Sequence, residues 1–148
     1  MTAAVTQKFE EMVLQVEDPD TPGTWLRICG MRGVSVTRTA SIESSEIPDC
    51  DDESVPDSIE KDVRAIDVSA SGTGVWAQSS HQLLMDWFYS ASARNVRLQN
   101  VRASTGATEF ETGPAFLADL SNERTKGQKV SASIEIQFNG TPTRTAAT

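Results

Sequence analysis

Residues 130–138 read VSASIEIQF, the most regular alternation of apolar and polar side chains in the chain. Side chains of a β-strand point to opposite faces in turn, so this period of two predicts a strand with one face in a core. The other face must meet water. That polar face carries Ser131, Ser133, Glu135 and Gln137.

Shorter alternations of the same kind predict further strands before this one. They lie at residues 12–16, 24–30, 34–39, 66–71, 94–101 and 110–120. The turn-forming run DPDTPG at residues 18–23 predicts a hairpin between the first two of them. The strand at 66–71 also has a hydroxyl-rich polar side, formed by Asp67, Ser69 and Ser71.

One segment changes period and predicts a single α-helix over about residues 80–92. Its apolar positions are Leu83, Leu84, Trp87, Phe88 and Ala91. Ser79 and Gln82 match a capping box at its start. Strands, one helix and more strands, in a chain of 148 residues, predict a single mainly-β domain over residues 1–148. The predicted architecture is an antiparallel β-sandwich or barrel with one helix.

Residues 41–62 hold nine acids and one lysine, and their charge of -8 equals that of the whole chain. Pro48 and Pro56 lie in the same segment, which therefore predicts a long exposed acidic loop. The polar ends of the chain, residues 1–8 and 139–148, are predicted to be flexible.

Composition also bounds the possible partners. A net charge of -8 and a pI near 4.6 have the wrong sign for specific recognition of nucleic acid. No apolar run approaches the roughly 18 residues that span a bilayer, so no membrane insertion is expected. The chain begins without a secretory signal, so we expect synthesis in the cytosol with Cys29 and Cys50 as reduced thiols.

The run GTGVWA at residues 72–77 fits the glycine pattern of a dinucleotide-binding turn. The predicted helix starts only after this run, and no acid stands about 20 residues further on, so no cofactor is expected. The glycines instead indicate a strand that bends or that another backbone approaches closely.

The acidic segment also matches alternate positions of a calcium-binding loop, from Asp49 to Glu60. Ser54 stands where that loop needs glycine, so no specific metal site is expected, while weak attraction of divalent cations stays open. His81 is the only histidine, and no Ser-His-Asp or Cys-His set can be assembled. We therefore assign no catalytic residue and expect no enzyme.

The order of these pieces resembles the tail tube (major tail) proteins of long-tailed bacteriophages and of phage-like gene transfer agents. The resemblance runs from about Glu11 to Phe138. It is carried by EEMVLQVED with WLRICGMRGVSVTR, by RAIDVSASGTGVW after the acidic segment, by the helix SSHQLLMDWFYSA with RNVRLQNV, and by FETGPAFLADLSNERTKGQKVSASIEIQFNG.

The resemblance implies a structural virion protein, made in the host bacterial cytoplasm, that forms homohexameric rings stacked into a tube. Other tail proteins would cap the ends of that tube, and DNA would pass through its lumen without specific binding. The candidate lumen-facing residues are Asp67, Ser69, Ser71, Ser131, Ser133, Glu135 and Gln137. The candidate inter-ring loop residues are Glu43, Glu46, Asp49, Asp51, Asp52, Glu53, Asp57 and Glu60. The alternative is a non-catalytic β-sandwich module for binding or decoration of a virion.

Overall fold

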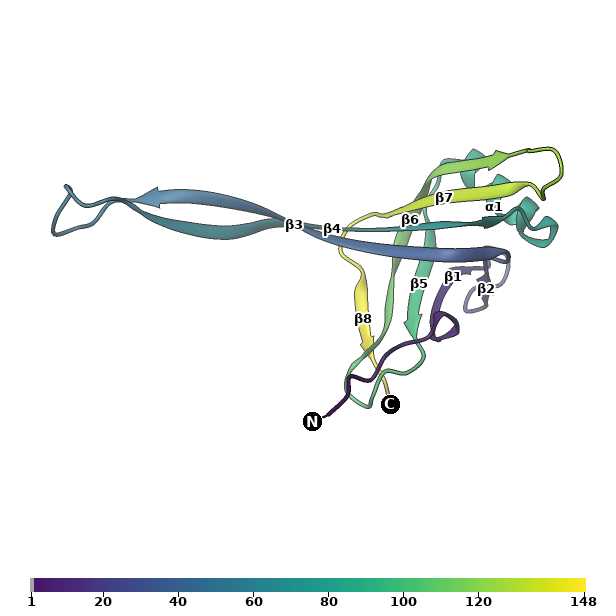
Figure 1. Cartoon of the computed structure of the whole chain (residues 1–148), viewed down its shortest axis with the longest axis horizontal. Helices are drawn as coiled ribbons and strands as arrows, with labels where there is room; N and C mark the ends of the chain where they lie inside the picture. The colour runs from purple at the N-terminus through teal and green to yellow at the C-terminus, as the bar shows by residue number, and fades with distance from the viewer. Residues whose placement is uncertain (1) are drawn as a thin grey trace.

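A computed structural model describes residues 2–148, which form a curved antiparallel body and a long two-stranded arm (Figure 1). The body contains one α-helix, and the mainly-β prediction is confirmed. The elements in chain order are η1 (Phe9–Glu11), β1 (Met12–Glu17), β2 (Trp25–Arg27), β3 (Met31–Ile47), β4 (Ser58–Val75), α1 (Gln78–Ser90), β5 (Arg94–Asn100), β6 (Thr108–Glu123), β7 (Ser131–Phe138) and β8 (Thr143–Ala146).

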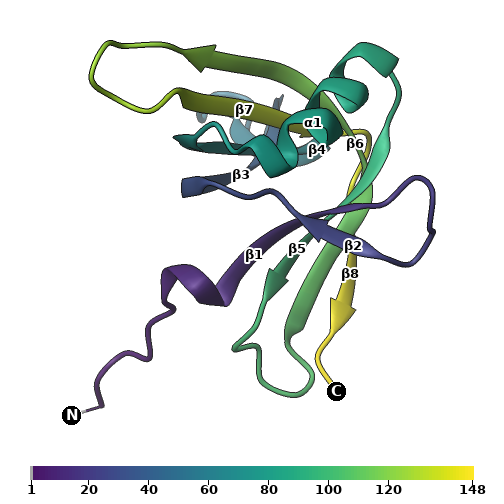
Figure 2. The same ribbon diagram turned by 90° about the vertical axis from the view of Figure 1, so that its right-hand side faces the viewer.

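The eight strands form one sheet in the order β2-β1-β5-β6-β7-β4-β3, with β8 paired to β6. The sheet turns a corner at β6, where Thr112 pairs with Thr143 of β8 but Ala115 pairs with Phe138 of β7. Pro114, which has no N–H to donate, lies between these two positions. The strands β3, β4 and β7 consequently lie across β1, β5 and β8 (Figure 2), as in orthogonally packed sheets.

The core lies between these two parts of the sheet. Val16 and Val96 come from β1 and β5, Ile134 and Ile136 from β7, and Trp87 from α1, and all are at most 1% exposed. The alternation at residues 130–138 thus places its apolar side in the core as predicted. Burial of each such side chain contributes about 1.5–3 kcal/mol, so this cluster dominates the stability of the body.

The helix begins two residues earlier than predicted, at Gln78, and the predicted capping box is wrong. The N-cap is Ala77, and no side chain caps the first turn. Ser80 is instead buried, and its hydroxyl accepts the backbone N–H of Cys29 at 2.9 Å. This tertiary hydrogen bond therefore ties the first turn of α1 to the connection before β3.

The predicted acidic loop at residues 41–62 is also wrong, because most of that segment is paired strand. β3 continues through Ile47, β4 starts at Ser58, and only residues 48–57 connect them. Ladder hydrogen bonds in a hairpin form between backbones, so exposed acids on the strands do not prevent pairing. The high charge of residues 41–62 correctly predicted that they are exposed, but it gave no indication of the strands.

The C-terminal segment 139–148 is not the flexible tail that its polarity predicts. β8 pairs with β6 through backbone groups, and the N–H of Ala147 donates to the carbonyl of Ala107 at 2.8 Å. Strand addition of this kind needs no apolar side chains. Residues 2–8 have no regular secondary structure, residue 1 lies outside the described residues, and flexibility of this end stays a prediction.

The glycines of the GTG run have the role that the sequence indicates. A Cβ on Gly74 would collide with the carbonyl oxygen of Gly30, and one on Gly72 would lie 2.9 Å from the sulfur of Met31. The same Gly30 carbonyl accepts the N–H of Val75 at 2.9 Å. Close approach of β4 to the start of β3 therefore requires glycine here.

Candidate functional site

The two polar series predicted from the sequence lie side by side on one surface. Ser69 of β4 pairs with Gln137 of β7, and Ser71 pairs with Glu135. Side chains that are directly opposite in an antiparallel pair point to the same face. Their sequence neighbours Val68, Ala70, Ile134 and Ile136 are buried, so both series face away from the core.

Strands β3 and β6 extend this surface, which the sequence alone could not place beside the other two. Thr37 pairs with Ser69 on one side, while Asp119 pairs with Glu135 on the other. We name the whole surface the polar strand face. It comprises Ser35, Thr37, Thr39, Asp67, Ser69, Ser71, Thr73, Phe116, Asp119, Ser121, Glu123, Ser131, Ser133, Glu135 and Gln137.

The charges on the polar strand face have one sign. Asp67, Asp119, Glu123 and Glu135 are acids, and none of the residues of this face is a lysine or an arginine. The remaining positions are mostly hydroxyls. Such a surface repels phosphates and holds water without offering a fixed contact to a polyanion.

The arm is the outer part of the hairpin that β3 and β4 form, residues 40–66, and its tip is the turn at residues 48–57. It has two unlike faces. Ile42 pairs with Val63, Glu46 with Ile59 and Ala40 with Ile66, so four large apolar side chains share the side that continues the core-facing side of β3. We name this the apolar arm face: Ile42, Ile59, Val63 and Ile66. They are 59%, 61%, 59% and 51% exposed. Glu46 and Lys61 lie on the same side as these four, and the opposite side carries Glu43, Glu60 and Asp62 together with Ile47.

The acids of the arm tip shape its turn. One carboxylate oxygen of Asp49 accepts the N–H groups of Asp51 and Asp52, at 2.8 and 3.0 Å. Asp52 accepts the N–H of Ser54 at 3.0 Å and its hydroxyl at 2.5 Å. Hydrogen bonds to the charged carboxylates lower the pKa of both residues. For Asp49 the donors are backbone N–H groups, whereas for Asp52 the Ser54 hydroxyl has the larger effect and the Ser54 backbone N–H the smaller.

The candidate inter-ring residues therefore divide between turn and strands. Asp49, Asp51, Asp52, Glu53 and Asp57 lie in the turn, whereas Glu43 and Glu46 lie in β3 and Glu60 in β4. Among the three ion pairs within residues 2–148, only the one between Glu43 and Arg64 involves an arm acid. In that part of the chain no three His, Cys, Asp or Glu side chains are grouped to hold a metal ion.

A family model described as phage tail tube protein matches residues 6–144. The chain belongs to the phage tail tube protein family. It is a structural component of a virion tail tube rather than an enzyme. No curated protein matches the sequence.

Solved structures share the fold at low sequence identity. The tail of an empty gene transfer agent particle with C6 symmetry has a TM-score of 0.76 at 13% identity, covering 95% of this chain and 100% of its own. The SPP1 tail tube has a TM-score of 0.67 at 9% identity, covering 96% and 80%. The sheath–tube complex of an extracellular contractile injection system has a TM-score of 0.58 at 14% identity, covering 96% and 93%.

Most of the side chains that suggest chemistry pack or form hydrogen bonds within the subunit. The indole N–H of Trp76 donates to Nδ1 of His81 at 3.1 Å, and the two rings pack edge to face. Trp87 is buried, and the guanidinium of Arg97 lies 4.5 Å from the ring centre of Trp25. Cys29 and Cys50 are free and exposed.

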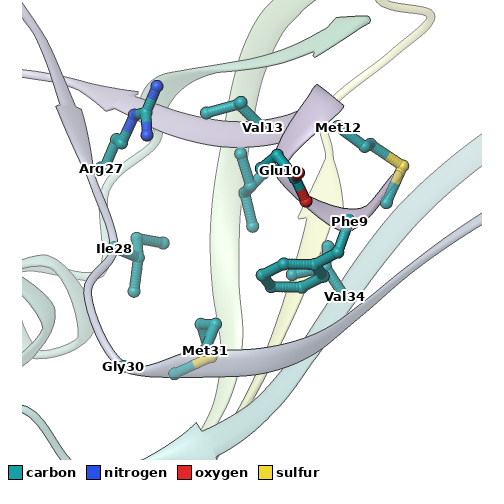
Figure 3. A pocket seen from close by; sticks show the side chains of 10 residues that line it. Phe9, Glu10, Met12, Val13, Arg27, Ile28, Gly30, Met31 and Val34 are labelled. Atoms are coloured by element: carbon teal, nitrogen blue, oxygen red, sulfur yellow. The ribbon is translucent and has the colours of Figure 1, made fainter. Parts of the chain in front are cut away.

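An apolar pocket of about 190 Å³ opens between η1, β1 and the start of β3 (Figure 3). Phe9, Met12, Ile28 and Met31 surround it, and its charged lining residues are Glu10 and Arg27. It lacks the convergent polar groups that orient a substrate. Within residues 2–148, no helix is long and apolar enough to cross a membrane.

Proposed function

We propose that the chain assembles into homohexameric rings, stacked into a tail tube whose lumen is lined by the polar strand face. The observation that carries this proposal is that four neighbouring strands join acids and hydroxyls into one polar strand face, on the side away from the core, whose named residues include no base. The C6 symmetry of the similar gene transfer agent tail supports six copies per ring.

A conduit for DNA must not hold DNA. Each phosphate that a lysine or arginine neutralises adds salt-dependent affinity, which acts as drag on a moving duplex. Asp67 and Glu135 act in the opposite direction, since carboxylates repel phosphates over about 8 Å at physiological salt. The DNA then passes through the lumen without specific binding, and other tail proteins close the two ends of the tube.

The arm reaches an adjacent ring. Its strands pair only with each other beyond Ser69, where the pairing of β4 with β7 ends. An exposed apolar strip on such a ribbon indicates a surface that a partner covers. The segment from Ile42 to Glu60 is accordingly mobile in the free subunit and ordered in the tube. The subunit is made in the host cytoplasm and functions in the virion tail.

Electron microscopy of the purified protein in negative stain, at rising concentration, tests the proposal. The expected result is rings or tubes of uniform diameter, with sixfold averages in end views. Particles that stay monomeric at every concentration would overturn the proposed self-assembly. Tubes with another symmetry would overturn the hexamer alone.

A further inference from the structure

The end of the body opposite the arm is basic. The turn between β6 and β7 contains Arg124, Lys126 and Lys129 and no acid, and Arg32 lies near the start of β3. We name these four residues the basic end. Arg32 and Lys129 line one groove of about 460 Å³ together with Val75 and Gln128, and the groove borders the polar strand face at Thr73 and Ser131. Figure 1 shows this turn and the arm tip at opposite ends of the long axis.

The charges at both ends lack partners within the subunit. Ion pairs in residues 2–148 join Arg38 to Glu111, Arg64 to Glu43 and Arg102 to Glu11, and none involves the basic end. All four basic-end residues are exposed. The acids at the arm tip are exposed as well. One molecule thus presents two unpaired surfaces of opposite sign.

We propose that the arm of one copy docks against the basic end of a second copy, in a head-to-tail contact. The proposal rests on the proposed tube function and deepens it by naming the surface that receives the arm. Acids such as Asp51 and Glu53 would face Arg124 and Lys129 of the neighbour. The apolar arm face would be covered in the same contact, beside Val75 in the groove.

Charge excludes a contact between two arms or between two basic ends. Two acidic arms that faced each other would repel, whereas an arm that meets a basic end is attracted, so the contact joins unlike ends of two copies. Charge alone also allows a reciprocal two-fold pair, in which each arm meets the other copy's basic end, and the tube function selects the head-to-tail contact. In a head-to-tail contact each arm meets a base-rich surface. The growing assembly therefore always has free arms at one end and free basic ends at the other. Contacts of this kind continue into an open assembly, as a tube requires, instead of closing as a dimer.

Charge-reversal variants test the contact. The arm variant carries Asp51→Lys, Glu53→Lys and Asp57→Lys, which spares Asp49 and Asp52 because their carboxylates shape the turn. The basic-end variant carries Arg124→Glu, Lys126→Glu and Lys129→Glu. A third variant combines all six changes and has the parent's net charge. Circular dichroism and thermal unfolding establish that each variant folds before assembly is measured.

Each three-residue variant alone is expected to raise the critical concentration for tube formation, measured by light scattering and microscopy, at least about tenfold, because like charges then meet at every contact. An equal mixture of the two, and the six-residue variant, are expected to assemble close to the parent concentration, because opposite charges meet again. This rescue is not expected from a merely structural effect.

The outcomes separate the two proposals. If both three-residue variants form tubes as readily as the parent, or if neither the mixture nor the six-residue variant recovers, the docking contact is wrong while the tube function stands. If the parent itself forms no tube at any concentration, the proposed function fails and the docking contact fails with it.

Discussion

The same two strands behave differently in the body and in the arm. Along β4, Val68 and Ala70 are 3% and 2% exposed because β7 and the rest of the body cover them. A few residues away on the same side of the ribbon, Ile42 and Val63 are 59% exposed. Alternation alone thus specifies an apolar face, whereas a covering element decides whether that face is a core or a docking surface.

The largest expected effect compares one isoleucine from each region. Ile136→Ala should lower the free energy of unfolding of the free subunit by about 2–5 kcal/mol, because Ile136 is fully buried. Ile59→Ala on the arm should change it by no more than about 0.5 kcal/mol. Denaturant titration of unassembled protein measures both. Equal losses would mean that the arm packs on its own body.

A second comparison concerns the close approach of β3 and β4, which only the body part requires. Gly74→Ala should cost about 1–3 kcal/mol, because the added Cβ meets the backbone at Gly30. Gly33→Ala is the matched control, since its Cβ would lie 3.4 Å from the Thr73 hydroxyl oxygen and should cost less. Thermal unfolding of the two proteins is the measurement. A Gly74 variant as stable as the control contradicts the close approach.

The third prediction concerns the charge of the polar strand face. Asp67→Lys with Glu135→Lys changes the charge by about 24 per ring of six while costing about 0.5 kcal/mol or less in folding, because both residues lie on the outer face. Tubes should form but retain DNA in a salt-dependent manner. DNA co-sedimentation with purified tubes measures this, with Asp67→Asn and Glu135→Gln as the uncharged control. If the lysine variant retains no more DNA at low salt than the uncharged control, the lumen assignment is refuted.

The fourth prediction follows the arm from free subunit to tube. Backbone amides between Ile42 and Glu60 should exchange rapidly in the free subunit, since an isolated two-stranded hairpin is marginally stable in water. They should become protected in the tube, whereas amides of β7 are protected in both. Hydrogen exchange with mass spectrometry resolves the two regions. Equal and low protection of the arm in both states argues against its burial by a neighbour.

The smallest expected effect is the acid response of the arm tip. Asp49 and Asp52 have a pKa below the ordinary value of 3.8, so their stabilisation of the turn is fully present above that pH. It is lost as the pH falls through the lowered pKa values. The amide shifts of Asp51 and Ser54 in NMR spectra should report this loss, and Asp52→Asn should remove the Ser54 component. If the amide shifts of Asp51 and Ser54 stay constant while the pH falls through the whole range in which carboxyl groups titrate, these hydrogen bonds are absent.

Sequence periodicity located all or part of β1 to β7, the single helix and both polar series. These predictions were successful because each depends on spacing along one segment. VSASIEIQF specifies its own buried and wet sides whatever its neighbours are. The acidic segment and the C-terminal segment were mispredicted for a common reason. Their strands, residues 41–47 and β8, are held by backbone pairing, which charged and polar side chains do not reveal.

By itself, the sequence determined which residues alternate, where the one helix lies and where the net charge is concentrated, because these are properties of local spacing and composition. Only the tertiary structure decided that β3, β4, β7 and β6 join their polar sides into one surface, and that β7 stops covering β4 near Ser69. Strand order and register depend on contacts between segments far apart in the chain. The positions of the polar strand face, the apolar arm face and the basic end relative to one another therefore cannot be read from any single segment.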